Sequence, residues 1–107
     1  MRVGFKLKLK NENVQEEYKK RHDQIWPEML EVLDKAGIKN YSIWNSGQDL
    51  FGYYEVKNLD YSDRVQAESE IVAKWNVYMQ DLLESRVDDD SNVFPVKEPM
   101  DLMFYKK

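Results

Sequence analysis

The single histidine of this chain lies in a run of residues that could transfer protons. His22 follows Tyr18 by four residues and precedes the pair Trp26 and Pro27. Histidine is the side chain that titrates unaided near neutral pH, and residues four apart on a helix share a face. We therefore expect the Tyr18 hydroxyl to lie beside the His22 ring, and the helix to end or bend at Trp26, because a residue before proline avoids helical geometry. An acid–base pair beside an aromatic wall suits a site for a small, neutral, hydroxyl-rich molecule.

The composition limits the partners that such a site could serve. The chain has 107 residues, of which 42% are hydrophobic and 34% charged, and this predicts one globular domain over residues 1–107. Its net charge is −4, with 16 basic residues interleaved among 20 acidic ones, so we expect no nucleic-acid partner. With no cysteine and one histidine, a thiolate site or a multi-histidine site within one protomer is excluded, and we expect no metal. No run of ~18 apolar residues occurs, and polar and apolar residues alternate at the amino terminus, so we expect a cytoplasmic protein with no membrane partner.

The elements that must position these residues begin with a strand and a broken helix. Apolar residues at odd positions predict a strand over residues 3–9. Asn13 and Glu16 fit a capping box at the start of a helix whose inward stripe carries the histidine. Pro27 can then open a second helical piece, which we expect to stop at Gly37.

Two strands and a second helical region follow. The strands are expected at about residues 39–44 and 50–56, joined by a turn over residues 45–48. Ser62 or Ser69 is expected to cap the next helical region. The apolar stripe of that region consists of Val72, Trp75, Met79 and Leu82.

The remainder of the chain is expected to be a solvated loop at residues 84–92 and a final strand at about residues 101–105. The loop contains three consecutive aspartates, which would not converge on a cation in an extended loop. The resulting order of strand, helix, two strands, helix and strand matches a ferredoxin-like βαββαβ fold of the α+β class, in which two helices cover one face of an antiparallel sheet.

The later strands are apolar on both faces. In residues 50–56, the even positions carry Leu50 and Tyr54 while the odd ones carry Phe51 and Tyr53. Two helices can cover one face only, and an antiparallel face in water would show polar residues. We therefore expect a second copy of the sheet on the other face, which makes the protein a homodimer.

Several segments of the chain resemble one known family. The run YKKRHDQIWPEM over residues 18–29 is long and mixes rare residue types, and the likeness continues in NYSIW at 40–44, LFGYYEV at 50–56, WNVYM at 75–79 and FY at 104–105. These segments resemble the L-rhamnose mutarotase family, small proteins that interconvert sugar anomers. The resemblance implies a dimeric α+β barrel in which two sheets pack together, and interconversion of the α and β anomers of L-rhamnose or a related aldose.

The resemblance also implies roles for particular residues. A lone histidine on an apolar stripe is more often a core residue, but the resemblance makes His22 the catalytic proton carrier, with Tyr18 as its partner. Trp75 matches an indole that shapes the sugar site. Asn76 replaces the second of two successive tryptophans found in many members of the family, and we expect this amide to alter the preferred sugar. Two further residues, Arg21 and Glu55, match family positions and could bind sugar hydroxyls, although a surface ion pair and a charge at a strand edge explain them equally well.

The chemistry expected of this site is general acid–base catalysis without a cofactor. Opening a hemiacetal removes a proton from the anomeric hydroxyl and delivers one to the ring oxygen, and closing on the other carbonyl face reverses both transfers. Two other functions remain open from the sequence alone. One is a dimeric ferredoxin-like oxygenase, by analogy of fold, and the other is a non-catalytic sugar-binding module, for which Asn76 is the hint.

Overall fold

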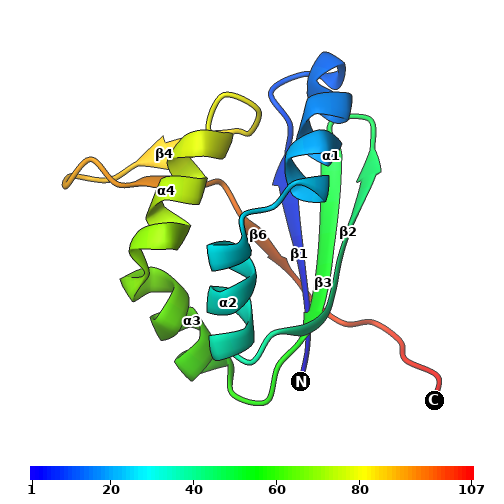
Figure 1. Cartoon of the computed structure of the whole chain (residues 1–107). Coiled ribbons are helices and arrows are strands. Elements are labelled where there is room, and N and C mark those ends of the chain that lie inside the picture. Colours follow the sequence, from blue (N-terminus) through cyan, green and yellow to red (C-terminus); the bar gives the residue numbers. More distant parts are fainter.

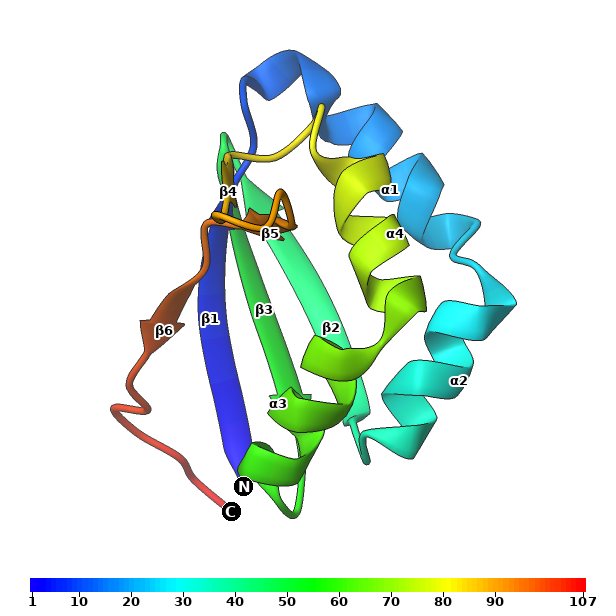
Figure 2. The same ribbon diagram turned by 90° about the vertical axis from the view of Figure 1, so that its left-hand side faces the viewer.

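A four-stranded antiparallel sheet with helices on one face forms the body of the molecule (Figure 1, Figure 2). The computed structural model describes residues 1–107. The strand order β2-β3-β1-β6 confirms the predicted ferredoxin-like α+β fold, with each helical crossover divided into two α-helices, the first of them preceded by a short 3-10 helix. The strands of the sheet are β1 (Arg2–Lys8), β2 (Lys39–Ser46), β3 (Asp49–Glu55) and β6 (Glu98–Met100), and the helices are the 3-10 helix η1 (Glu12–Val14), α1 (Gln15–Asp23), α2 (Pro27–Lys35), α3 (Leu59–Glu68) and α4 (Glu70–Met79).

The breaks between helices have local causes. Trp26 has an extended backbone (φ −61°, ψ 137°), and Pro27 occupies the first position of α2. Ser69 ends α3, and its hydroxyl accepts a hydrogen bond from the Val72 N–H in the first turn of α4. Gly37 follows α2 with φ +75°, which glycine adopts without steric cost. The predicted break at Trp26, the cap at Ser69 and the stop at Gly37 are confirmed.

Two other helix starts differ from the prediction. The expected capping box at Asn13 is wrong, because Asn11 accepts a hydrogen bond from the Asn13 N–H at 2.8 Å and caps η1 instead. Asn13 lies within this 3-10 helix, and the residue that precedes α1 is Val14, which has no polar side chain. α1 therefore begins without a side-chain cap. Asn58 caps α3, because its side-chain oxygen accepts a hydrogen bond from the Tyr61 N–H in the first turn of that helix. Ser62, an alternative cap expected from the sequence, lies within α3 and is fully buried.

The inner face of the sheet packs against the helices. β1 and β3 pair along their full length, from Arg2 opposite Glu55 to Lys8 opposite Asp49. A side chain at Gly52 would overlap the Phe5 ring, so this glycine allows the ring to lie across β3. The core that results contains Phe5, Leu7, Leu9, Tyr18, Met29, Ala36, Ile38, Leu50, Tyr54, Val56, Trp75, Met79, Leu82 and Leu83.

The carboxyl-terminal segment differs most from the elements expected from the sequence. The predicted loop at residues 84–92 contains the strand β4 (Ser85–Val87), which forms a small hairpin with β5 (Val93–Pro95), just beyond that loop, and the last strand of the sheet is β6. The predicted strand at 101–105 is wrong: these residues form no strand and are exposed. The reason lies in the register, because Met100 already pairs with Gly4 and β1 has only two residues left beyond that point. As a separate finding, none of the helices is long and apolar enough to cross a membrane.

Candidate functional site

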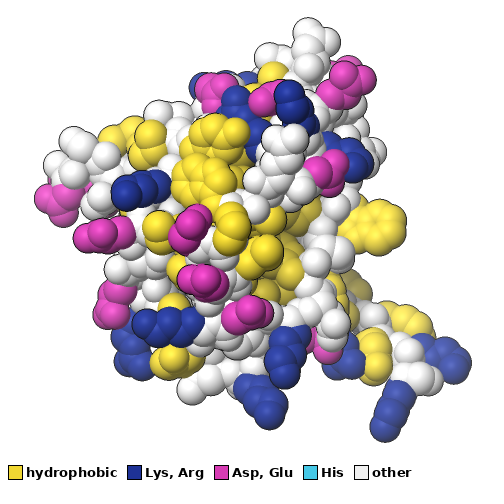
Figure 3. All heavy atoms as spheres, viewed as in Figure 1, with side chains coloured by type: hydrophobic (Ala, Val, Ile, Leu, Met, Phe, Trp, Pro, Cys, Tyr) yellow, Lys and Arg dark blue, Asp and Glu magenta, His cyan; other side chains and the backbone are white.

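A cavity of about 730 Å³ lies between the helices and the inner face of the sheet. Its walls come from α1, α2, α4, the inner face of the sheet and the hairpin that follows α4. Figure 3 shows apolar side chains gathered between the helices on this side of the molecule, bordered by acidic and basic ones. Four residues singled out in the sequence line this cavity together, namely Tyr18, His22, Trp75 and Asn76.

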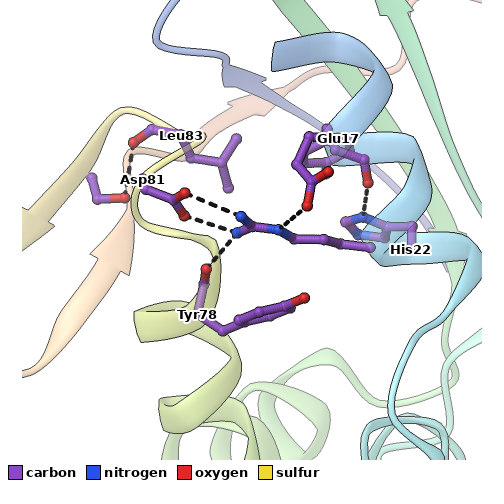
Figure 4. A network of polar contacts seen from close by, with 8 residues as sticks. Glu17, His22, Tyr78, Asp81 and Leu83 are labelled. Atoms are coloured by element: carbon purple, nitrogen blue, oxygen red, sulfur yellow. Dashed lines mark hydrogen bonds and ion pairs between the residues drawn. The ribbon is translucent and has the colours of Figure 1, made fainter.

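The environment of His22 favours a neutral imidazole with one free nitrogen. Its Nδ1 lies 3.1 Å from the backbone carbonyl oxygen of Tyr18 (Figure 4). A carbonyl can only accept, so Nδ1 carries the proton and Nε2 of the neutral ring keeps its lone pair. Burial lowers the pKa of His22 below 6.5, and this effect exceeds the opposing effects of the Tyr18 carbonyl and of Asp23. The ring is therefore a proton acceptor at neutral pH.

Tyr18 stacks on the histidine but does not bind it through its hydroxyl. The two ring centroids are 4.4 Å apart, with an interplanar angle of 30°. The expected neighbourhood of Tyr18 and His22 is present, but the hydrogen bond between them uses the Tyr18 carbonyl. No buried side-chain polar atom lacks a partner, so the unbonded Tyr18 hydroxyl is accessible from the cavity. Burial raises the pKa of Tyr18 above its usual range, which keeps the phenol protonated as a hydrogen-bond donor.

The indole of Trp75 forms the wall beside the histidine. Its ring meets His22 edge to face with centroids 5.4 Å apart, and it meets Trp26 in the same way at 5.1 Å. Trp75 is buried, so its position is fixed by packing. Asn76 follows on the same helix, lines the cavity and is half-buried, and its amide makes no hydrogen bond within the protein. An amide that is free to donate and to accept can therefore meet a ligand there.

Tyr41 is a cavity residue that the sequence did not single out. It lies on the inner side of β2, and its ring packs 5.5 Å from that of Tyr54 and 6.1 Å from that of Phe5. Burial raises the pKa of the Tyr41 phenol, and the neighbouring phenol of Tyr18 raises it further. The signal that could have identified it is the alternation of β2, which places Tyr41 on the same face as Ile43.

Arg21 lies outside the cavity in a network that joins two helices (Figure 4). Its guanidinium donates to Asp81 through two nitrogens at 2.8 and 3.1 Å, to the Tyr78 carbonyl at 2.7 Å and to Glu17 at 3.1 Å. These bonds use four of the five N–H groups of an arginine. The ion pair lowers the pKa of Asp81. The geometry thus shows that Arg21 joins α1 with the end of α4, outside the cavity.

Glu55 lies away from the cavity as well. It is near the end of β3, where its carboxylate accepts a hydrogen bond from Asn40 Nδ2 at 3.1 Å. With Asn40 it lines a separate, smaller hollow of about 410 Å³. The structure therefore brings His22, Tyr18, Trp75 and Asn76 together and leaves Arg21 and Glu55 elsewhere.

The arrangement suits proton exchange with a hydroxylated molecule. One wall offers a neutral imidazole that can accept a proton and a phenol that can donate a hydrogen bond. Indole and phenyl rings provide apolar surface for C–H groups, and an amide provides a directional polar contact.

Comparisons with known proteins identify the family of this chain. The sequence model of L-rhamnose mutarotase matches residues 2–106. An L-rhamnose mutarotase from Listeria monocytogenes serotype 4b is 43% identical over 86 residues, covering 78% of this chain and 82% of the relative. One from Formosa agariphila is 36% identical over 106 residues, covering 97% and 96%.

Solved structures agree. The crystal structure of an L-rhamnose mutarotase from Formosa agariphila superposes with a TM-score of 0.83 at 35% identity, covering 100% of this chain and 99% of the other. A dimeric ferredoxin-like protein from an uncultured marine organism has a TM-score of 0.62 at 14% identity, which supports the fold alone. The chain belongs to the L-rhamnose mutarotase family.

Proposed function

We propose that this protein interconverts the α and β anomers of L-rhamnose by opening and closing the pyranose ring. The observation that carries the proposal is family membership, since the family model spans residues 2–106. The cavity supports it, because it contains an acid–base group for ring opening and aromatic surface for binding a small aldose. In this proposal residues 1–107 act as one domain.

His22 is the proton carrier in this reaction. Its Nε2 takes the proton of the anomeric hydroxyl while the bond from the anomeric carbon to the ring oxygen breaks and its electron pair moves to that oxygen. The imidazolium then gives the same proton to the ring oxygen, which leaves an open-chain aldehyde and a neutral histidine. Rotation about the bond to the carbonyl carbon exposes the other face, and the two transfers run in reverse.

The remaining residues bind and orient the sugar. The raised pKa of Tyr18 makes its phenolate unfavourable, so Tyr18 contributes a hydrogen bond and not a proton. Trp75 supplies the apolar platform beside His22. Asn76 replaces indole surface with hydrogen-bonding groups, and we assign it the choice among related aldoses. Arg21 and Glu55 are not included among the sugar ligands, because their side chains are held elsewhere.

We also propose that the protein is a homodimer, with the outer face of the sheet covered by a second copy. Large apolar side chains are exposed on this face and on the segment after β6: Trp44 is 70% exposed and Phe104 is 80% exposed. Exposed apolar surface of this size favours association. A cytoplasmic location is part of the same proposal, and fractionation of cells producing the protein would test it.

Saturation-transfer NMR on L-rhamnose tests the proposed activity. Saturating the anomeric proton of one anomer should reduce the signal of the other in proportion to enzyme concentration. Repeating the measurement across a panel of aldoses gives the sugar preference. Binding of L-rhamnose without any acceleration of exchange would contradict the proposal and favour a non-catalytic sugar-binding protein.

A further inference from the structure

One basic residue of the cavity has no acidic partner. Two lysines line the cavity, and Lys19 pairs with Asp23 at 2.6 Å. Lys97, in the segment between β5 and β6, forms no ion pair and donates no hydrogen bond within the protein. It lines the cavity and is exposed to solvent.

The amine of Lys97 lies against aromatic rings of the sheet. Its Nζ is 4.3 Å from the centre of the Phe5 ring and 5.9 Å from that of Tyr54. Aromatic faces attract an ammonium but do not saturate its three N–H donors. Burial lowers the pKa of Lys97, and Asp63, the carboxylate that acts on it, raises it by a smaller amount. The donors of Lys97 are therefore available for another acceptor.

The position of Lys97 complements that of His22. The histidine and Trp75 belong to helices, whereas Lys97 rests on the rings of β1 and β3, on the sheet side of the same cavity. A molecule held between helices and sheet can meet both groups. A hydroxyl oxygen on the sheet side would accept a charge-assisted hydrogen bond, which is stronger than one from a neutral donor.

We propose that Lys97 is a substrate-binding residue that donates a hydrogen bond to a ring hydroxyl of the bound aldose, on the side of the sugar that faces the sheet. This inference rests on the proposed function, because it takes the cavity to be the sugar site. It assigns specificity as well: the site discriminates against an aldose that lacks the contacted hydroxyl, since the lysine is then left unpaired. The structural alternative is that Lys97 only holds the segment before β6 onto the sheet through its aromatic contacts.

Substitution of Lys97 by methionine separates these roles. Lys97→Met keeps a long apolar side chain on the Phe5 ring and removes the donors. Affinity for L-rhamnose, followed by tryptophan fluorescence, should fall ~10-fold or more, while the exchange rate at saturation changes less. Lys35→Met, at the exposed end of α2, is the matched control and should bind like the wild type.

A series of monodeoxy analogues of L-rhamnose identifies the contact itself. The wild type should bind the analogue that lacks the contacted hydroxyl more weakly than it binds L-rhamnose. Lys97→Met should bind the two sugars with nearly the same affinity, because its hydrogen bond to that hydroxyl is already lost. Equal penalties in both proteins for every hydroxyl would overturn the proposal. Unchanged affinity together with a lowered melting temperature in Lys97→Met would also overturn it and assign Lys97 to the structural alternative.

A second variant and the exchange rate of the wild type complete the test. Should Lys97→Met fail to fold, Lys97→Leu also removes the donors and keeps an apolar side chain, so an unchanged affinity in that variant overturns the proposal. Measuring anomer exchange by the wild type separates failure of this inference from failure of the proposed function. If the wild type exchanges anomers and Lys97→Met binds L-rhamnose as tightly as the wild type does, the role of Lys97 is wrong and the proposed activity stands. If sugar binding depends on Lys97 but the wild type does not accelerate anomer exchange, the proposed activity is wrong and the role of Lys97 stands.

Discussion

At the scale of single residues, the chemistry of the site depends on where one proton resides. The Tyr18 carbonyl holds the proton of neutral His22 on Nδ1 and leaves Nε2 free. Burial favours the neutral ring by disfavouring its charged form. The spacing of four residues on α1 thus has two effects: the Tyr18 carbonyl fixes the tautomer of His22, and the Tyr18 ring stacks on the imidazole.

This environment predicts the pH dependence of catalysis. Because the pKa of His22 lies below 6.5, the active neutral form should predominate at pH 7 and be lost as the pH falls through that pKa. We expect the enzyme-dependent exchange rate to be level above about pH 7 and to decline under more acidic conditions. A rate profile by saturation-transfer NMR, corrected for the uncatalysed reaction, provides the measurement. A catalytic rate that increases on acidification below pH 6.5 would show that the imidazolium is the active form.

Asn76 permits a prediction about the choice of sugar. An indole in place of its amide would remove the hydrogen-bond acceptor, leave a single N–H donor and fill part of the cavity. Asn76→Trp should therefore change the order of preference among aldoses by ~10-fold in relative kcat/KM, without loss of stability. Exchange rates across the aldose panel for both proteins test this. If the two profiles coincide, Asn76 does not contact the sugar.

At the scale of secondary-structure elements, the network of Arg21 makes a second kind of prediction. Arg21 joins α1, which carries His22, to the end of α4, which carries Trp75. Arg21→Met should lower the free energy of unfolding by ~1 kcal/mol, because the pair is partly exposed, and should reduce kcat more than affinity by loosening the contact between His22 and Trp75.

Chemical denaturation and sugar titration together test this prediction. Asp81→Asn offers a comparison, because it weakens the same network from the segment after α4 and leaves the arginine in place. We expect the two variants to behave alike. A large loss of affinity in Arg21→Met, with stability unchanged, would return Arg21 to the sugar ligands.

The elements also show which parts of the fold could be predicted from sequence. Local rules located the break at Trp26, the stop at Gly37 and the cap at Ser69, because proline, glycine and serine act on the backbone beside them. The strand expected at residues 101–105 is displaced, since its position depends on the register with β1, a distant pairing that no local pattern encodes.

The candidate site also contains residues that the sequence predicts and residues whose positions depend on long-range contacts. Helical periodicity placed Tyr18 and His22 on one inward face, and the resemblance added Trp75 and Asn76, all four of which line the cavity. Lys97 could not be found from sequence, because it comes from a connection with no periodic pattern and reaches the cavity through the tertiary fold. Arg21 adjoins His22 in sequence, yet its partner Asp81 is 60 residues away, and this long-range pair determines where its side chain lies.

At the scale of the whole molecule, the exposed apolar face of the sheet predicts a dimer. Trp44 and Phe51 pair across β2 and β3 on the face away from the helices. Sedimentation at micromolar concentration should give twice the mass of the 12.9 kDa chain. Trp44→Glu should yield monomeric or insoluble protein, because burying an unpaired charge costs several kcal/mol.

A matched control is available on the helical side. Val77 is apolar and 50% exposed on α4, so Val77→Glu adds the same charge away from the proposed interface and should leave the dimer intact. Wild-type protein that sediments as a single chain, or dissociation of both variants alike, would contradict this assignment of the interface.

The rate of L-rhamnose anomer exchange when His22 is replaced tests most directly whether this histidine carries the proton. His22→Ala should fold normally, by circular dichroism, and lower the enzyme-dependent exchange rate by ~10²-fold or more, the scale of a general acid–base group. His22→Asn keeps a hydrogen-bonding side chain but cannot carry the proton near neutral pH, so it should be nearly as slow. Folded His22→Ala protein that exchanges anomers at the wild-type rate, with the wild-type pH profile, would show that His22 is not the proton carrier.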